Sequence, residues 1–213
     1  GKWAAMAITE PGTGSDSANI RTSATRDGDD FILNGEKIYV TSGERADCVV
    51  VWATLDRNLG RAAIKSFVVE KGTPGMTVTR LEHKLGIKAS DTAAINFTDC
   101  RVPVANLLGN PEIDVGKGFA GVMETFDNTR PLVAAMAVGC AKASLERTKE
   151  LLKDYLDPNY STLPLNASNV VATVTRMEAE WEAARLLTLK AAWMADNKQP
   201  NSKEASIAKA KAG

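Results

Sequence analysis

The sequence predicts an α+β protein in which an antiparallel β-barrel or β-sandwich is followed by part of an up-down α-helical bundle. Short β-branched and aromatic runs, separated by Gly, Pro and Asp turn signals, fill the chain to about Gly109. Beyond Gly116, apolar residues recur at three- and four-residue steps, as in amphipathic helices. We therefore expect a β-domain over residues 1–110 and a partial bundle over residues 111–213. The periodicity does not choose between barrel and sandwich.

The first half contains short strands at hairpin spacing. The apolar run Trp3–Ile8 reads as a buried strand that stops at Pro11, which has no N–H for a sheet ladder. Turn signals at Asp27-Gly28-Asp29 and Asn34-Gly35 separate the next strands. Thr73-Pro74-Gly75 is a third turn, because Pro pre-sets φ and Gly allows positive φ. Further strands are expected at 20–26, 30–33, 37–41, 47–54, 64–70, 77–81 and 93–97.

The second half predicts helices. We expect one over 119–126 and a new one from Asp127 or Asn128, with Pro131 in its first turn. The Ala-rich stretch 132–156 suits either a generic buried helix or a close-packed bundle or subunit interface. Residues 170–197 carry an apolar stripe typical of a long helix. Asn201 and Glu204 have capping-box spacing for a last helix.

Composition excludes several classes of function. Lys plus Arg and Asp plus Glu both number 26, so no net charge favours nucleic acid or an anionic membrane. No apolar run reaches the ~20 residues of a membrane span. The first residues resemble neither a signal nor a transit peptide. Three widely spaced cysteines predict reduced, packed thiols. Because His83 is the only histidine in the sequence, His-rich zinc sites are excluded. It lies in a charged run, which favours an exposed loop.

The stretch Ile8–Asp16 is the first candidate site. Gly12 and Gly14 allow conformations closed to other residues, and the loop offers backbone N–H groups and three hydroxyls. Such a loop can hold an anionic or polar cofactor edge, and it is equally typical of an ordinary turn. No P-loop, Cys-x-x-Cys pair or Gly-x-Gly-x-x-Gly unit is present, so a redox cofactor would be held in another way. No metal site is predicted.

Four stretches, taken together in order and spacing, resemble the acyl-CoA dehydrogenase family of flavoenzymes. They are Ile8-Thr-Glu-Pro-Gly-Thr-Gly-Ser-Asp16, Lys37-Ile-Tyr-Val-Thr-Ser-Gly43, Leu85-Gly-Ile-Lys-Ala-Ser-Asp-Thr92 with its continuation to Gly109, and Phe126-Asp-Asn-Thr-Arg-Pro131. The resemblance runs from Ala7 to Gly213 and thins between Tyr155 and Val174. It implies FAD, bound at the junction of the β-domain and the bundle.

The resemblance also implies flavin contacts. Thr9 is expected to hydrogen-bond the pyrimidine edge, Tyr39 to lie against the rings where many relatives carry Trp, and Thr41 to reach the N5 side. Hydrogen-bond donors near a flavin favour hydride acceptance, because they meet the charge gained on reduction. The implied cofactor-binding residues are Met6, Ala7, Ile8, Thr9, Ser15, Tyr39, Val40 and Thr41.

The family reaction removes an α-proton and a β-hydride from an acyl-CoA thioester and leaves a trans-2-enoyl-CoA. The resemblance implies substrate contacts by Ser15, Asp127, Asn128, Thr129 and Arg130, with Arg61 in a loop that aligns poorly. Most members carry a Glu base near the C-terminus, and a minority carry the base at the position of Thr129. No catalytic residue is therefore assigned. The usual N-terminal helical domain and the base-bearing segment lie outside this sequence, so the chain alone is expected to be inactive.

One stretch departs from the family pattern. Where relatives carry an Arg-x-x-Phe-Gly motif that grips a neighbour's FAD diphosphate, Tyr155–Pro164 has no Arg or Lys. A non-catalytic subunit or fragment serving assembly or acyl-CoA binding, and an acyl-CoA oxidase, therefore remain alternatives. The resemblance further implies an electron-transfer flavoprotein as electron acceptor, a homotetramer built as a dimer of dimers, and a bacterial cytoplasmic or mitochondrial matrix location.

Overall fold

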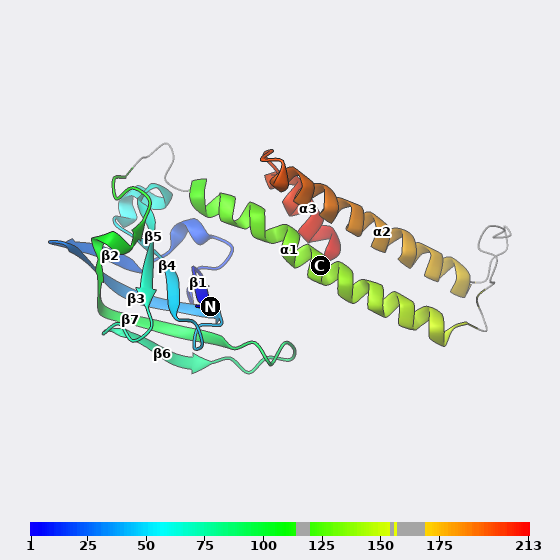
Figure 1. Ribbon diagram of the computed structural model, residues 1–213, viewed down its shortest axis with the longest axis horizontal. Coiled ribbons are helices and arrows are strands. Elements are labelled where there is room, and N and C mark those ends of the chain that lie inside the picture. Colours follow the sequence, from blue (N-terminus) through cyan, green and yellow to red (C-terminus); the bar gives the residue numbers. More distant parts are fainter. Residues whose placement is uncertain (114–119, 154–155, 157–168) are drawn as a thin grey trace. The chain divides into compact units, whose positions relative to one another are not determined.

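The computed structural model describes residues 1–113, 120–153, 156 and 169–213, and the side chains of 120–124 are not part of the description. The chain separates into two compact units, Gly1–Ala120 and Gly121–Gly213. Figure 1 shows the strands in the first unit and the long helices in the second. The predicted α+β fold class is confirmed.

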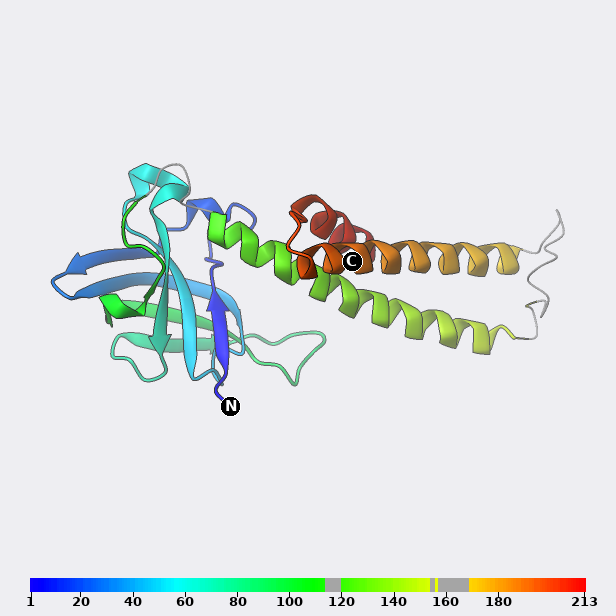
Figure 2. The same cartoon turned by 45° about the horizontal axis from the view of Figure 1, so that its top comes forward.

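The first unit is built on one twisted eight-stranded sheet with the order β6-β7-β3-β2-β4-β5-β8, and β1 pairs with β4 (Figure 2). Most neighbours are antiparallel, while β1 runs parallel to β4 and one bridge joins β2 to β4 in parallel. The strands are β1 (Ala4–Ala7), β2 (Ser23–Asp27), β3 (Asp30–Thr41), β4 (Cys48–Thr54), β5 (Ile64–Glu70), β6 (Met76–Leu81), β7 (Thr92–Pro103) and β8 (Leu107–Leu108). Short 3₁₀ turns cover Ser17–Asn19, Arg57–Ala63 and Val104–Asn106.

The core of this unit comes from alternate residues of the long strands. Leu33, Val51 and Ile95 are fully buried, as expected where every second side chain faces inward. Phe31 and Phe67 meet edge to face with ring centroids 5.1 Å apart. The resulting cluster holds β3, β4, β5 and β7 together and so fixes the strand ends that carry the candidate site.

The turn predicted at Asn34-Gly35 is wrong, because β3 continues through both residues to Thr41. Gly35 has φ 151°, and a Cβ at this position would lie 2.5 Å from Thr22 Oγ1. The register between β3 and β7 shifts between Leu33 and Gly35. The glycine therefore permits a β-bulge and a close approach to Thr22. Both are common reasons for a glycine inside a strand.

The second unit contains α1 (Ala120–Leu151), α2 (Asn169–Asp196) and α3 (Ser202–Ala212). The predicted long helix over 170–197 is confirmed as α2, and its stripe buries Val171, Val174, Ala184 and Ala191. Ala191 packs with Ala134 of α1 and Ala208 of α3. Small side chains thus form the contact of the three helices.

The new helix predicted to begin at Asp127 or Asn128 is wrong, because α1 is continuous and contains Pro131 in its interior. Proline has no N–H, so the Asp127 carbonyl loses its i+4 donor. The Asn201 side-chain amide donates to Asp127 O at 3.5 Å and to Ala191 O at 3.1 Å. The predicted capping box is also wrong, since Asn201 makes no side-chain cap bond. Its amide instead compensates for the proline.

The structure decides several smaller expectations. His83 is exposed, as predicted. All three cysteines are free, but Cys100 alone is buried and Cys140 is exposed, so the packing expected of all three is wrong. None of the described helices has a stretch long and apolar enough to cross a membrane. Within the described residues, no three His, Cys, Asp or Glu side chains are grouped to hold a metal ion. Apart from Leu156, the stretch Tyr155–Pro164 lies outside the described residues.

Candidate functional site

The loop that follows β1 is a closed turn. Glu10 N donates to Thr13 O at 3.0 Å, and Thr13 N donates to Glu10 O at 3.1 Å. The Thr13 hydroxyl donates to Asn19 O at 3.3 Å. These groups are therefore not free for a ligand, contrary to expectation. Neither Gly12 nor Gly14 has a positive φ, and a Cβ atom at either position would have no other atom within 4 Å. The conformational role predicted for these glycines is therefore wrong.

A buried ion pair lies beneath this loop. Lys37 on β3 is 0 % exposed, and its Nζ donates to Glu10 Oε1 at 2.8 Å and to Ile8 O at 3.1 Å. Glu10 Oε1 also accepts from the Thr22 amide at 2.9 Å and the Thr22 hydroxyl at 2.6 Å. Glu10 Oε2 accepts from the Arg21 amide at 2.6 Å. The pair thus ties the loop after β1 to β3 and to the segment entering β2.

Burial and the ion pair act together on the pKa values of both groups. Burial lowers the pKa of Lys37 to about 8, although Glu10 opposes the shift. Burial alone would raise the pKa of Glu10, but Lys37 and the hydrogen bonds from Thr22 outweigh it and lower that pKa. At neutral pH both side chains are therefore charged and mutually compensated.

Thr9 and Tyr39 lie side by side above this pair. Ile38 N donates to Thr9 O at 2.9 Å, which joins the loop to β3 next to Tyr39. Tyr39 has φ 57°, within a second register shift of β3, and its side chain is 62 % exposed. Among the hydrogen bonds of the described residues, none uses the Thr9 amide or hydroxyl as donor. An exposed aromatic residue and two uncommitted donors thus lie on neighbouring backbone segments.

The other residues predicted to bind the cofactor occupy both exposed and buried positions. Met6, Ser15 and Thr41 are exposed, and Thr41 pairs with Thr92 of β7 just beyond Tyr39. Ala7, Ile8 and Val40 are buried, so they can line a ligand only through backbone atoms.

Apart from Ser15, the predicted substrate residues Asp127, Asn128, Thr129 and Arg130 belong to α1, in the second unit. Arg130 Nη1 donates to Asp127 Oδ1 at 2.8 Å, and its guanidinium lies 5.5 Å from the centre of the Phe126 ring. Thr129 donates to Phe126 O at 3.4 Å, while Asn128 is exposed. Arg130 is thus partly committed within its own helix, as a local i,i+3 pair.

A polar hollow of about 410 Å³ in the first unit was missed by sequence reasoning. It is lined by Arg21, Arg57, Asn19 and Thr54, and Arg57 Nη2 donates to Arg21 O at 2.7 Å. The Thr54 hydroxyl is buried and has no partner among the described residues. Arg61, the residue expected to contact substrate, belongs to the same 3₁₀ turn as Arg57 but does not line the hollow. The charged loop was the only available signal.

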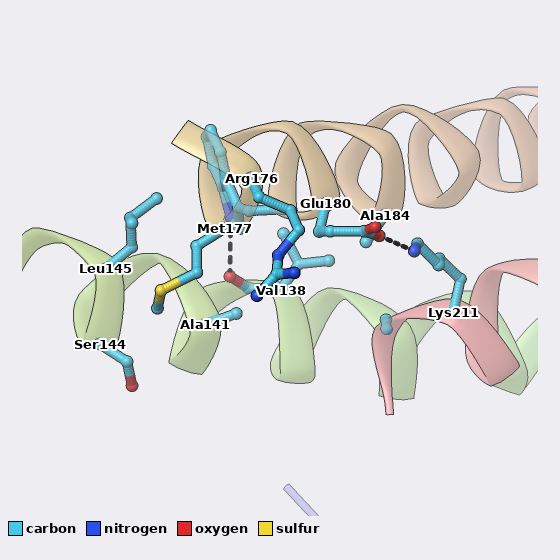
Figure 3. Close-up of a pocket in the computed structure, with 11 residues that line it drawn as sticks. Val138, Ala141, Ser144, Leu145, Arg176, Met177, Glu180, Ala184 and Lys211 are labelled. Atoms are coloured by element: carbon cyan, nitrogen blue, oxygen red, sulfur yellow. Dashed lines mark hydrogen bonds and ion pairs between the residues drawn. The ribbon is translucent and has the colours of Figure 1, made fainter. Parts of the chain in front are cut away.

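A second, mostly apolar groove of about 390 Å³ lies among the three helices (Figure 3). Trp181 Nε1 donates to Val138 O at 3.1 Å among the residues that line it, and Lys211 pairs with Glu180 at one end. Figure 3 shows Leu145, Met177 and Ala141 along the same groove. None of the predicted site residues lines it.

Two family profiles match most of the sequence. Residues 5–100 match the profile described as acyl-CoA dehydrogenase, middle domain, and residues 116–213 the one described as acyl-CoA dehydrogenase, C-terminal domain. Mouse mitochondrial short-chain specific acyl-CoA dehydrogenase is 40 % identical over 98 % of this chain and 49 % of its own length. The chain thus spans about half the length of the curated relatives it matches.

Two solved structures are similar over nearly the whole chain. Butyryl-CoA dehydrogenase from Megasphaera elsdenii superposes with a TM-score of 0.86 at 38 % identity, covering 99 % of this chain and 54 % of that one. A chain from a study of the electron transferring flavoprotein of Acidaminococcus fermentans gives a TM-score of 0.86 at 36 % identity, with the same coverage.

Proposed function

Because the chain belongs to the acyl-CoA dehydrogenase family, we propose that it forms part of a site for FAD-dependent α,β-dehydrogenation of an acyl-CoA thioester to trans-2-enoyl-CoA. The observation that carries this proposal is the Thr9–Tyr39 edge, where the two uncommitted donors of Thr9 and the exposed Tyr39 lie on neighbouring backbone segments. These residues fit a flavin, which needs donors along its pyrimidine edge and a flat apolar neighbour. FAD bound there would accept the hydride that leaves the substrate β carbon.

The chain's own residues would bind and orient the cofactor. Thr9 would donate to the pyrimidine edge, Tyr39 would cover one side of the rings, and Thr41 would reach the N5 side. Donors held in place before reduction stabilise the charge that develops without reorganising. We assign these roles, with the backbone of Met6–Ile8 and Val40, to the β-domain expected over residues 1–110.

Cationic and hydroxyl groups would take the CoA part of the substrate. Arg21 and Arg57 line the polar hollow together with the unpartnered Thr54 hydroxyl, a donor set suited to phosphate. Ser15 on the exposed loop is a further contact, and Asp127, Asn128, Thr129 and Arg130 of residues 111–213 would bind the thioester end. The whole enzyme would pass electrons to an electron-transfer flavoprotein and assemble as a dimer of dimers, in the bacterial cytoplasm or the mitochondrial matrix.

The test is flavin binding, followed by reduction of the bound flavin by an acyl-CoA thioester. We expect the purified chain to acquire a flavin absorbance band with FAD, and Thr9→Val and Tyr39→Ala each to weaken binding about tenfold. Thr77→Val, an exposed threonine of β6, is the matched control and should bind FAD as the wild type does. Wild-type affinity in both site variants would refute the placement of the flavin. Butyryl-CoA serves as the first substrate probe, with an artificial electron acceptor.

A second candidate is a non-catalytic chain that keeps the fold and binds acyl-CoA. The absence of Arg and Lys from Tyr155–Pro164 favours it, because a diphosphate would lose a strong partner there. Binding of butyryl-CoA, weakened by Arg57→Ala, without any flavin band would select this function. Turnover in which oxygen alone reoxidises the reduced flavin would select the oxidase instead.

A further inference from the structure

The Lys37 ammonium is bonded to the peptide group that carries the Thr9 amide. Lys37 Nζ lies 3.1 Å from Ile8 O, and the Ile8 carbonyl and the Thr9 N–H belong to one peptide unit. A cation at the carbonyl oxygen polarises the unit and makes its N–H a stronger donor, particularly where water is excluded. Lys37 is 0 % exposed, and the Thr9 amide has no acceptor among the described residues. The strengthened donor is therefore available to a ligand.

Lys37 contacts this peptide directly, and further hydrogen bonds hold the residues that follow it. Lys37 binds Ile8 O, Ile38 N binds Thr9 O, and Glu10 accepts from Lys37, from Thr22 and from the Arg21 amide. The buried pair is also electrically balanced, because Glu10 is the only charged group in contact with Lys37 among the described residues. Removing either charge leaves the other uncompensated close to Thr9.

We propose that Lys37 is a positioning residue that acts through the Ile8 carbonyl: it orients and strengthens the Thr9 amide as a donor to the flavin pyrimidine edge, and with Glu10 it sets the preference of the site for reduced over oxidised FAD. This inference rests on the proposed function. Reduction places negative charge on the flavin, so a stronger donor and a nearby cation favour the reduced form.

The test uses the opposite charges of the pair. Glu10→Gln, measured at a pH low enough to keep Lys37 protonated, leaves an uncompensated cation and should increase the affinity for reduced relative to oxidised FAD about tenfold. Lys37→Met leaves an anion and should decrease the same ratio about tenfold. A tenfold change corresponds to about 30 mV in a two-electron couple, measurable by dithionite titration against a reference dye. The double variant should lie between the two. A purely structural role would weaken FAD binding in both single variants without shifting the ratio in opposite directions.

Lys65→Met is the matched control. Lys65 also donates to backbone carbonyls, those of Asn110 and Glu112, but Lys65 is only half-buried and these bonds are exposed to solvent. Its loss should leave the ratio unchanged. Should Lys37→Met fail to fold, Glu10→Gln measured against the double variant gives the same test of sign, because the double variant contains no unpaired buried charge.

A measurement without cofactor separates the inference from the proposed function. The amide resonance of Thr9 in ¹⁵N–¹H spectra should move upfield in Lys37→Met and stay in place in Lys65→Met. Ratios that shift in one direction in both single variants, or do not shift, would overturn the inference while FAD binding by the wild type still supports the proposed function. If the wild type does not bind FAD, the proposed function is overturned. The assignment of the flavin as the acceptor of the hydrogen bond from Thr9 is then overturned as well.

Discussion

At the scale of single residues, the most consequential contact is the ion pair of Lys37 and Glu10. Both side chains are buried, and every oxygen of the carboxylate accepts at least one hydrogen bond. Removing one partner leaves a buried charge without compensation, which typically costs about 3–5 kcal/mol, while removing both costs much less. Lys37→Met and Glu10→Gln should therefore each destabilise the protein by about that amount in urea unfolding. The double variant should be at least about 2 kcal/mol more stable than either, and simple additivity would contradict this coupling.

The same pair predicts a pH dependence of stability. Burial lowers the pKa of Lys37 from 10.5 to about 8, so between these values the unfolded chain holds a proton that the folded chain has released. The free energy of unfolding then rises with pH across this window, by up to about 3 kcal/mol. The pKa of Glu10 is lowered below 4.5, so its contribution is lost as pH falls through that lowered value. The difference in the free energy of unfolding between the wild type and the double variant, measured by urea titration at a series of pH values, should show both slopes. A difference that stays flat from pH 8 to 10.5 would exclude the first.

Sequence reasoning at this scale reached Thr9, Tyr39 and Thr41 only through the family resemblance, since hydroxyls and aromatics at strand ends have many uses. It did not reach Lys37 and Glu10 as a pair. They lie 27 residues apart, and their contact depends on how the loop after β1 folds over β3. A lysine inside a strand otherwise indicates an exposed position. Pairing of this kind is a property of the tertiary structure.

At the scale of elements, Asn201 replaces the hydrogen bond that Pro131 removes from α1. Asn201→Ala leaves the Asp127 and Ala191 carbonyls without this donor and should destabilise the helical unit by about 1–3 kcal/mol. In a Pro131→Ala background an amide again reaches Asp127 O, so the same change should cost about 1 kcal/mol less. Thermal unfolding followed by circular dichroism at 222 nm measures this cycle. Equal costs in the two backgrounds would show that Asn201 acts through Ala191 alone.

Element boundaries were predictable where local chemistry decides them. The strand expected at Ile64–Glu70 is β5 with the same ends, because a β-branched run is bounded by a loop and a turn. Asn34-Gly35 misled because the same dipeptide suits a hairpin turn and a bulge. The close approach of Thr22, twelve to thirteen residues earlier, decides between them. Pro131 misled for a related reason, since the donor that rescues α1 comes from Asn201, 70 residues later.

At the scale of the whole molecule, the two units differ in how well they bury apolar side chains. The sheet unit buries large residues such as Phe67, Phe97 and Leu33. Among the described side chains of the helical unit, five of the eight buried apolar residues are alanines, and the largest are Leu145, Val171 and Val174. Larger apolar side chains of its helices are exposed, including Leu132, Met136, Leu186, Leu189 and Trp193. Burial of such side chains contributes about 1.5–3 kcal/mol each, so this unit lacks much of the stabilisation that its composition could provide.

We therefore expect the helical unit to unfold first and to be stabilised by self-association. Exposed apolar faces of this kind mark contact surfaces, and association with the native state raises the midpoint of unfolding with concentration. The ellipticity at 222 nm should be lost at a lower temperature than the amide I infrared band of the β-sheet, and its midpoint should rise between 1 and 100 µM, roughly as mass action requires. Leu186→Gln, at an exposed position, should reduce the dependence on concentration, whereas Thr77→Val in the sheet unit should leave it unchanged. A monomer by sedimentation whose midpoint does not vary with concentration would contradict the prediction, because the exposed side chains would then have no partner whose binding stabilises the fold.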